Sequence, residues 1–345
     1  MLKNELPHLA LSAPVNVTWE ITRLCNAKCL HCLSSTRMAE CQEELDFSEC
    51  RAFIDQLLAA QVFQINIGGG EPFLRSDIWD IFAYCHQRQL VTCSSTNGSL
   101  IDKEAAQRLA KSPYHFLQIS LDGPTEKVND NIRGKGSFAI AISALENLIK
   151  ANFPHLSINT VVTAANYKHI AELYQLASFY GAKLRLSRFR PSGGGVKMWE
   201  AYRLSQEQTI GLAEVLSAHT DILTGDSFFA ITKEDRQHLG LNMCGAAKLT
   251  CAISPDGNFY PCAFLQQPPF LCGNIRRESF QKIWRQAPVL QMLRSLQVNA
   301  CENCHRFDIC HGGCPAIAWH IHQDLTLPDP TCIESAIKNK THFLV

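Results

Sequence analysis

Short apolar segments alternate with amphipathic segments through the first half of the chain. Six of the apolar segments have the length and β-branched content of buried strands, at 15–20, 62–67, 91–95, 116–121, 156–162 and 184–189. Segments with helical periodicity lie between them, at 48–61, 77–87, 101–111, 137–151 and 167–180. We expect Ser48 to cap the first helix, Ser76 or Asp77 to cap the second, and Gly181 to end the last.

The regular alternation of strand and helix predicts the fold class. Repeated strand–helix units imply right-handed βαβ crossovers and a parallel sheet. Six units are fewer than the eight of a closed barrel. The sequence therefore predicts an α/β fold, with a partial (β/α)6 barrel over residues 13–220. Ligands are expected at the C-terminal ends of the strands, where the βα loops gather.

The second half of the chain differs in composition and lacks the regular alternation of strands and helices. A glycine-rich stretch at 191–195 predicts a flexible break, and a further helix is expected over 204–218. From residue 239 onward, Cys, Gly, Pro and aromatic residues replace the regular alternation. We expect a boundary between 220 and 240, followed by a small cysteine-rich domain over 240–340. This domain has little continuous apolar patterning, so metal binding is expected to stabilise it.

Composition and charge narrow the classes of function. The chain has 345 residues, 46% of them hydrophobic and 19% charged, as in ordinary globular proteins. Lys+Arg and Asp+Glu both number 32, so neither nucleic acid nor a polyanionic surface is an expected partner. Lys3, Glu5 and His8 interrupt the N-terminal segment, which lacks the apolar centre of a signal peptide. No apolar run can span a bilayer, so we expect a cytoplasmic protein without a membrane partner.

The 16 cysteines are many for a reducing compartment, and they point to metal ligation. Cys25, Cys29 and Cys32 follow the first strand with CxxxCxxC spacing. Three thiolates on one loop can ligate three irons of a cubane cluster and leave the fourth iron open. An open coordination position is typical of a catalytic metal site. A zinc loop is the alternative, although zinc sites usually pair two CxxC knuckles and this loop has no second knuckle nearby.

A second group of cysteines lies near the C-terminus. Eight of them, with Gly257, form a specific spacing that is sufficient for two complete four-ligand clusters: Cys244, Cys251, Cys262, Cys301, Cys304, Cys310, Cys314 and Cys332. Two zinc ions are the alternative, because the CxxC at 301–304 also fits zinc. The remaining cysteines are interpreted as small buried apolar residues, namely Cys41, Cys50, Cys85, Cys93 and Cys272.

The first cysteine loop resembles that of the radical S-adenosylmethionine (SAM) superfamily. Members of that superfamily bind SAM through its amino and carboxylate groups on the open iron. One electron from the cluster then breaks a carbon–sulfur bond and yields a 5′-deoxyadenosyl radical. An aromatic residue usually precedes the third cysteine of the family motif, and His31 holds that position here.

The loops after the second, third and fourth strands match superfamily segments that line SAM. Residues 68–72 (GGGEP) match the motif that holds the SAM amino group, and Arg133 matches a position that reaches the SAM carboxylate. The resemblance thus implies a SAM site made of Gly68, Gly69, Gly70, Glu71, Ser95, Asn97, Ser120, Asp122 and Arg133. Taken singly, the glycines also suit a tight turn, Asp122 a turn residue and Arg133 a surface charge. No catalytic acid or base is assigned.

The C-terminal spacing resembles the SPASM domain, which carries two auxiliary [4Fe–4S] clusters in radical SAM enzymes. The resemblance implies that an inner cluster is held by Cys244, Cys251, Cys262 and Cys314. An outer cluster would be held by Cys301, Cys304, Cys310 and Cys332. Three [4Fe–4S] clusters and SAM are therefore the expected cofactors.

Further segments resemble the mycofactocin maturase family: 18–20, 32–35, 62–72, 190–193, 223–229 and 241–246. The resemblance implies oxidative decarboxylation of the C-terminal tyrosine of a small precursor peptide, followed by a carbon–carbon bond between valine and tyrosine. The sequence departs from the family pattern at 193–195, where a bulkier basic residue is expected, and at Cys272, where alanine is usual. These departures leave room for a paralogue with another peptide substrate.

The same resemblance implies a separate protein that presents the peptide, and an external electron donor. About fourteen residues precede the first strand, too few for a peptide-binding domain, which points the same way. One rival reading is a sulfatase-type or pyrroloquinoline quinone-type maturase. Sulfatase maturases carry an aspartate after the third inner cysteine, where this chain has Ala263. Another rival is a non-catalytic iron–sulfur electron carrier, which has no use for the 68–72 motif.

Overall fold

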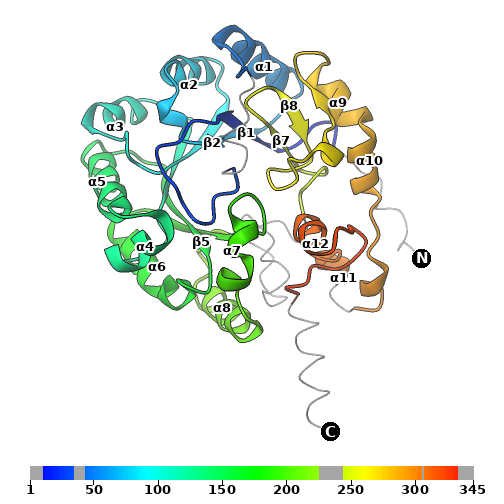
Figure 1. Ribbon diagram of the computed structural model, residues 1–345. Helices are drawn as coiled ribbons and strands as arrows, with labels where there is room; N and C mark the ends of the chain where they lie inside the picture. Colours follow the sequence, from blue (N-terminus) through cyan, green and yellow to red (C-terminus); the bar gives the residue numbers. More distant parts are fainter. Residues whose placement is uncertain (1–10, 35–42, 225–243, 305–306, 333–345) are drawn as a thin grey trace.

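The computed structural model describes residues 11–34, 43–224, 244–304 and 307–332, and Figure 1 shows their arrangement. One sheet of nine strands organises them, in the order β6-β5-β4-β3-β2-β1-β7-β8-β9. Its first six strands are all parallel. They are β1 (Asn16–Thr22), β2 (Gln64–Gly69), β3 (Val91–Thr96), β4 (His115–Ser120), β5 (Leu156–Val162) and β6 (Lys183–Arg188). The sheet ends at β6 and β9 without closing, which confirms the predicted partial barrel.

Helices α1 (Phe47–Ala59), α2 (Ile78–Gln87), α3 (Lys103–Leu109), α5 (Ser137–Lys150) and α6 (Ile170–Phe179) lie outside the curved sheet (Figure 1). The other helices of the barrel are α4 (Glu126–Arg133), α7 (Gly195–Tyr202) and α8 (Gln206–Ala218). Burial alternates along the strands, as in β5, where Leu156 and Ile158 are buried and Ser157 and Asn159 are half-buried. Polar side chains bond across neighbouring strands, as Ser187 does when its Oγ donates to Asn159 Oδ1 at 3.0 Å.

The C-terminal part of the chain extends the same sheet. It contributes β7 (Thr250–Ile253), which pairs in parallel with β1, and then β8 (Asn258–Tyr260) and β9 (Gly273–Asn274) in antiparallel order. Its helices are α9 (Phe280–Gln286), α10 (Pro288–Arg294), α11 (Phe307–Cys310) and α12 (Pro315–His322). Phe280 packs against Phe53 of the barrel, with ring centroids 6.0 Å apart. The C-terminal part therefore shares its core with the barrel, while the expected boundary at 220–240 falls largely outside the described residues.

The helices of the barrel differ from the prediction at two points, the cap of α1 and the presence of α4. Asp46, and not Ser48, caps α1: its side chain accepts from Glu49 N at 2.8 Å, and Glu49 Oε2 accepts from Asp46 N at 2.9 Å. This reciprocal capping box outcompetes the isolated serine two residues later. Helix α4 was not expected at all, because its sequence is strongly polar and buries only Asn129 and Ile132.

The glycine-rich stretch at 191–195 is not a flexible break. It runs directly into α7, and Gly194 N donates to Cys32 O at 2.8 Å. Gly193 has a φ of +56°, and a Cβ there would lie 2.2 Å from Leu33 O. These glycines allow close backbone contact with the first cysteine loop, which a bulkier basic residue at 193 would prevent.

Within the described ranges, no helix combines the length and apolar character needed to cross a membrane.

Candidate functional site

Residues 22–34, the cluster loop, leave the C-terminal end of β1 and carry the first three cysteines. Burial raises the pKa of the Cys25, Cys29 and Cys32 thiols, and charge on Cys29 raises the pKa of Cys25 and Cys32 further. The structure thus brings these three predicted ligands within electrostatic range of one another. Buried thiols become thiolates only where positive charge compensates them, and bound iron supplies that charge. The donor set therefore fits a metal cluster.

The second strand supports the cluster loop through its glycine-rich end. Gly70 N donates to Thr22 O at 2.8 Å, and Glu71 N donates to Leu24 O at 2.7 Å. A Cβ on Gly70 would lie 1.9 Å from Leu24 O, so only glycine fits there. A Cβ on Gly68 would meet nothing within 4 Å. Gly70 is thus needed for the loop itself, whereas Gly68 leaves space in which a ligand can approach the strand end.

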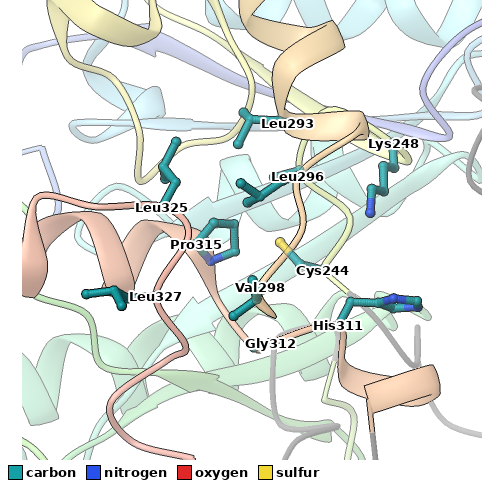
Figure 2. A pocket seen from close by; sticks show the side chains of 12 residues that line it. Cys244, Lys248, Leu293, Leu296, Val298, His311, Gly312, Pro315, Leu325 and Leu327 are labelled. Atoms are coloured by element: carbon teal, nitrogen blue, oxygen red, sulfur yellow. The ribbon is translucent and has the colours of Figure 1, made fainter. Parts of the chain in front are cut away.

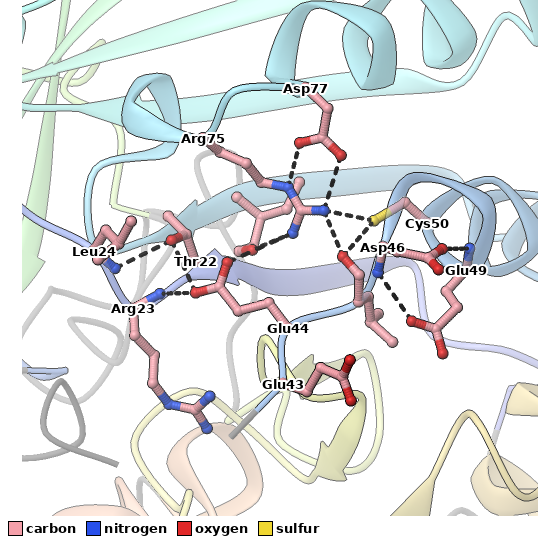
Figure 3. Close-up of polar contacts among 12 residues, drawn as sticks. Thr22, Arg23, Leu24, Glu43, Glu44, Asp46, Glu49, Cys50, Arg75 and Asp77 are labelled. Carbon is pink, nitrogen blue, oxygen red and sulfur yellow. Dashed lines mark hydrogen bonds and ion pairs between the residues drawn. The ribbon is translucent and has the colours of Figure 1, made fainter. Parts of the chain in front are cut away.

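An arginine from the loop after β2 fixes the start of the cluster loop (Figure 3). Arg75 donates to Ile21 O at 2.8 Å and to Asp77 Oδ1 at 2.6 Å. Its guanidinium also lies 3.9 Å from Glu44 Oε2. Glu44 accepts from Thr22 Oγ1 at 3.0 Å and from Arg23 N at 2.8 Å. Sequence reasoning did not identify this network, because its members come from three separate segments.

Glu71 joins the ends of β2 and β3. Its carboxylate is 1% exposed and accepts from Thr96 Oγ1 at 2.7 Å and from Asn97 N at 2.8 Å. Burial raises its pKa, and these donors only partly offset that effect. Asn97 also reaches the cluster loop, donating from Nδ2 to Asn26 Oδ1 at 2.8 Å. Glu71 and Asn97 therefore both contact the cluster loop, and their expected contact with SAM stays a prediction.

Two further polar residues of the predicted SAM site, Ser95 and Ser120, lie on β3 and β4. Ser95 Oγ is 3.4 Å from Gln118 Oε1, and the half-buried Ser120 ends β4. Both lie toward the C-terminal strand ends, where a partial barrel binds its ligands.

Asp122 and Arg133, predicted separately, form one buried ion pair. Asp122 Oδ2 lies 2.6 Å from Arg133 Nε and 3.0 Å from His31 Nε2. Burial alone would raise the Asp122 pKa, but Arg133 and His31 lower it from 3.8 to about 2. Arg133 also donates from Nη1 toward Cys29 Sγ at 3.9 Å. The pair thus anchors the cluster loop to the ends of β4 and α4. The contact with Asp122 gives His31 a role at the position where the family usually has an aromatic residue.

We predict that Asp122→Asn lowers the free energy of unfolding of the metal-free protein by about 3–5 kcal/mol, because Arg133 is left buried without its counter-charge. Urea titration monitored by circular dichroism measures this change. The matched control is Asp55→Asn, which breaks the exposed pair with Arg88 and should cost at most about 1 kcal/mol.

The same ion pair gives a pH dependence. The pKa of Asp122 is lowered on folding, so its stabilisation is fully present above pH 3.8 and is lost as the pH falls toward 2. The Asn variant should lack this component of acid unfolding. An unchanged urea midpoint in the Asn variant at neutral pH would contradict the structural role of the pair.

Three of the four predicted inner cysteines come together in the C-terminal part. Burial raises the pKa of Cys244 and of Cys262 to about 12, and charge on Cys314 adds to both shifts. We call Cys244, Cys262 and Cys314 the inner group. Cys251, the fourth predicted member, is buried in β7, and the charges that act on it are those of Cys272 and Arg294. Cys272 in turn feels the charge of Cys262, and the role of Cys251 as the fourth inner ligand stays a prediction.

A pocket lies beside the inner group, and Figure 2 shows Cys244 on its wall. Leu293, Leu296 and Pro315 line it together with Lys248. Burial lowers the pKa of the Lys248 ammonium, while charge on the Cys244 thiolate raises it. Lys248 therefore lies within electrostatic range of Cys244.

The outer cysteines lie on short turns near the C-terminus. Cys301 ends a 3-10 turn, Cys304 N donates to Cys301 O at 2.9 Å, and Cys310 ends α11. Cys332 N donates to Asp329 O at 3.0 Å. Of the cysteines interpreted as apolar, Cys50, Cys85 and Cys93 are buried and Cys272 is half-buried, while Cys41 lies outside the described residues.

Within the described part of the chain, no three His, Cys, Asp or Glu side chains approach closely enough to share a single metal ion. A cubane cluster does not need that approach, because each of its irons takes one thiolate.

Comparison with known proteins defines the class. Residues 19–177 match the radical SAM superfamily, and residues 244–306 match the SPASM iron–sulfur cluster-binding domain. The structure of Streptococcus suis SuiB bound to its precursor peptide SuiA has the same fold, with a TM-score of 0.79 and 21% identity over 94% of this chain and 76% of that chain. The chain is thus a radical SAM enzyme with a SPASM domain, and iron–sulfur clusters and SAM are its cofactors.

The particular family follows from the sequence relatives. Mycofactocin maturase MftC of Mycolicibacterium smegmatis is 44% identical over 94% of this chain and 84% of its own length. The protein of the same name from Mycobacterium ulcerans is 43% identical over 94% of this chain and 89% of its own length. The chain belongs to the mycofactocin maturase family. The motif residues at 225–229 and 241–243, which carried part of the expected resemblance, lie outside the described residues.

Proposed function

We propose that this protein cleaves SAM reductively and uses the resulting radical to modify a ribosomal precursor peptide in mycofactocin biosynthesis. Oxidative decarboxylation of a C-terminal tyrosine comes first, and carbon–carbon crosslinking of valine to tyrosine follows. The observation that carries this proposal is the 44% identity to a mycofactocin maturase over 94% of the chain. The cysteine loop at the C-terminal ends of the parallel strands is consistent with it.

We assign Cys25, Cys29 and Cys32 as ligands of the SAM-cleaving cluster, with one iron left for SAM. When bound, that cluster supplies the electron that breaks the carbon–sulfur bond of SAM. The chain contributes positioning and shielding. Gly70 and Glu71 hold the loop backbone, and Arg133 places positive charge beside Cys29.

The wider SAM site follows from the strand ends. We propose that SAM lies along the end of β2 at Gly68 and Gly69, where Gly68 leaves open space. Ser95, Asn97 and Ser120 would face it from the next two strands. Asp122 orients Arg133, and the donors of Arg133 suit the SAM carboxylate.

The C-terminal part would hold two auxiliary [4Fe–4S] clusters. The inner group holds one of them, with Cys251 as its fourth ligand. Cys301, Cys304, Cys310 and Cys332 hold the other. The residues of the proposed radical SAM and SPASM units are 13–220 and 240–340. The partners are the precursor peptide, a small peptide-presenting protein and an external electron donor, all in the reducing cytoplasm.

The test of this function uses a peptide that ends in Val-Tyr. Anaerobic incubation with the reconstituted protein, reductant, SAM and the presenting protein should remove the mass of formic acid from the peptide. The matched control is the same peptide with an amidated C-terminus, which cannot release its carboxylate and should stay intact. If 5′-deoxyadenosine accumulates while the Val-Tyr peptide stays intact beside its presenting protein, the peptide assignment is wrong.

Cys310→Ala is predicted to separate SAM cleavage from modification of the peptide. SAM cleavage should continue, because the cluster loop is untouched, whereas yield of modified peptide should fall about tenfold or more as the outer cluster loses a ligand. Mass spectrometry of deoxyadenosine and peptide measures both quantities in one sample. Normal peptide yield from this variant would remove the outer cluster from the reaction.

A further inference from the structure

Two buried arginines at the end of β6 face the inner group. Arg190 Nε donates to Cys314 Sγ at 3.4 Å, and its Nη1 donates to Arg188 O at 3.3 Å. The Arg190 guanidinium stacks on the Phe264 ring, with Cζ 4.0 Å from the ring centroid. Arg190 is 6% exposed, so solvent screens its charge little. The stacking on Phe264 and the hydrogen bond to Arg188 O keep the Nε–H of Arg190 directed at Cys314 Sγ.

The neighbouring arginine is committed to a different partner. Arg188 Nη1 lies 2.9 Å from Asp329 Oδ2, and both side chains are buried. Asp329 Oδ2 also accepts from Cys314 N at 3.1 Å, and Asp329 Oδ1 accepts from Thr331 N at 3.0 Å. The Arg188–Asp329 pair therefore fixes the backbone of Cys314 to β6. The hydrogen bond to Cys314 Sγ comes from Arg190, while Arg188 acts on that sulfur through its charge.

We propose that Arg190 is a positioning residue that sets the reduction potential of the inner auxiliary cluster through its hydrogen bond to Cys314. This inference rests on the proposed function, which makes Cys314 a cluster ligand. Reduction of a thiolate-ligated cluster adds one negative charge, and a donated N–H together with a fixed positive charge stabilises that state. Arg190 thereby raises the potential.

The position of Arg190 gives this effect a use in the reaction. It follows directly on β6, at the C-terminal strand end where a partial barrel binds its substrate. Decarboxylation of the peptide radical releases one electron as CO2 leaves, and a cluster held by the inner group would accept that electron. A raised potential favours this transfer. Arg190 thus links the substrate end of the barrel to the electron acceptor.

The experiment compares Arg190→Gln with the wild-type protein by anaerobic redox titration of the fully reconstituted enzyme, followed by EPR. The SAM-binding cluster is identified by the change in its spectrum when SAM is added. We expect iron content and SAM cleavage to be retained. The midpoint potential of one auxiliary couple should fall by about 59 mV, a tenfold change in its reduced-to-oxidised ratio at a fixed potential. Arg88→Gln, which removes an exposed arginine on α2, should shift neither couple.

An unchanged auxiliary potential in the Gln variant with full iron content would overturn the inference and leave the proposed function standing. If the Gln variant loses iron, Arg190→Lys decides, because it keeps the charge but removes the Nε donor: it should lower the potential by a smaller amount. A wild-type potential in the Lys variant, or loss of auxiliary iron from both variants, would also overturn the inference. A wild-type protein without any auxiliary couple would instead refute the proposed cluster assignment.

Discussion

Cys25→Ala is expected to abolish SAM cleavage while the C-terminal clusters stay bound. The cluster loop offers three thiolates, and a cubane cluster cannot keep an open catalytic iron when only two of them remain. The inner group lies ahead of β7, on the loop after β8 and ahead of α12, so its folding does not depend on Cys25. Iron analysis should show a loss of about one third of the iron, since one of three equal clusters is removed.

Deoxyadenosine is the product to measure, with Cys85→Ala as the matched control. Cys85 is a buried thiol of α2, distant in sequence from every assigned ligand. Its replacement by alanine should leave SAM cleavage intact. Full SAM turnover by Cys25→Ala would contradict the assignment of the open cluster to this loop.

Gly70→Ala is expected to have an effect of similar size without removing any ligand. The new Cβ would lie 1.9 Å from Leu24 O and 2.6 Å from Leu24 C, which are backbone atoms directly before Cys25. Backbone cannot give way as a flexible side chain does, so the cluster loop must leave β2 and lose the hydrogen bond from Gly70 N to Thr22 O. We expect SAM cleavage to fall about a hundredfold or more, as for misplacement of a reacting group by about 1 Å.

Iron content and deoxyadenosine yield of Gly70→Ala are measured beside Gly211→Ala. Gly211 lies in α8, and a Cβ there meets nothing within 4 Å. That control should be neutral or should gain about 0.5–1 kcal/mol of stability, the usual helical preference for alanine. A Gly70→Ala protein with full iron and wild-type turnover would show that the close approach at Leu24 is not required.

The barrel strands were predictable because each is a short apolar segment between turn signals. Residues 156–162 were placed to the residue, and β3 and β6 to within one residue at each end. Helix α4 was not predictable by apolar periodicity, since its polar residues serve a site: Arg133 pairs with Asp122 at its end. The Asp46 cap was missed although Asp46 and Glu49 have the capping-box spacing, a local signal that Ser48 lacks.

The residues of the candidate site also divide into those that local sequence identifies and those that depend on contacts between distant segments. The cysteines of the cluster loop were identified by spacing, which is local information. The role of Gly193 was not, because its contact with Leu33 joins segments far apart in the chain. Cys251 and Cys262 fit the same spacing rule, but strand pairing buries Cys251 in β7, in register with Val17. Arg190 lies in a segment that resembles the family, but its hydrogen bond to Cys314 was not predictable, since it depends on the folded approach of β6 to the C-terminal part.

The most direct test of the account is the formation of 5′-deoxyadenosine. The protein is reconstituted anaerobically, reduced with dithionite and given SAM, and the nucleoside is measured by mass spectrometry with and without a Val-Tyr peptide and its presenting protein. We predict that deoxyadenosine forms only with reductant, and that the peptide then loses the mass of formic acid. Absence of deoxyadenosine from protein with fully loaded clusters would contradict the central claim.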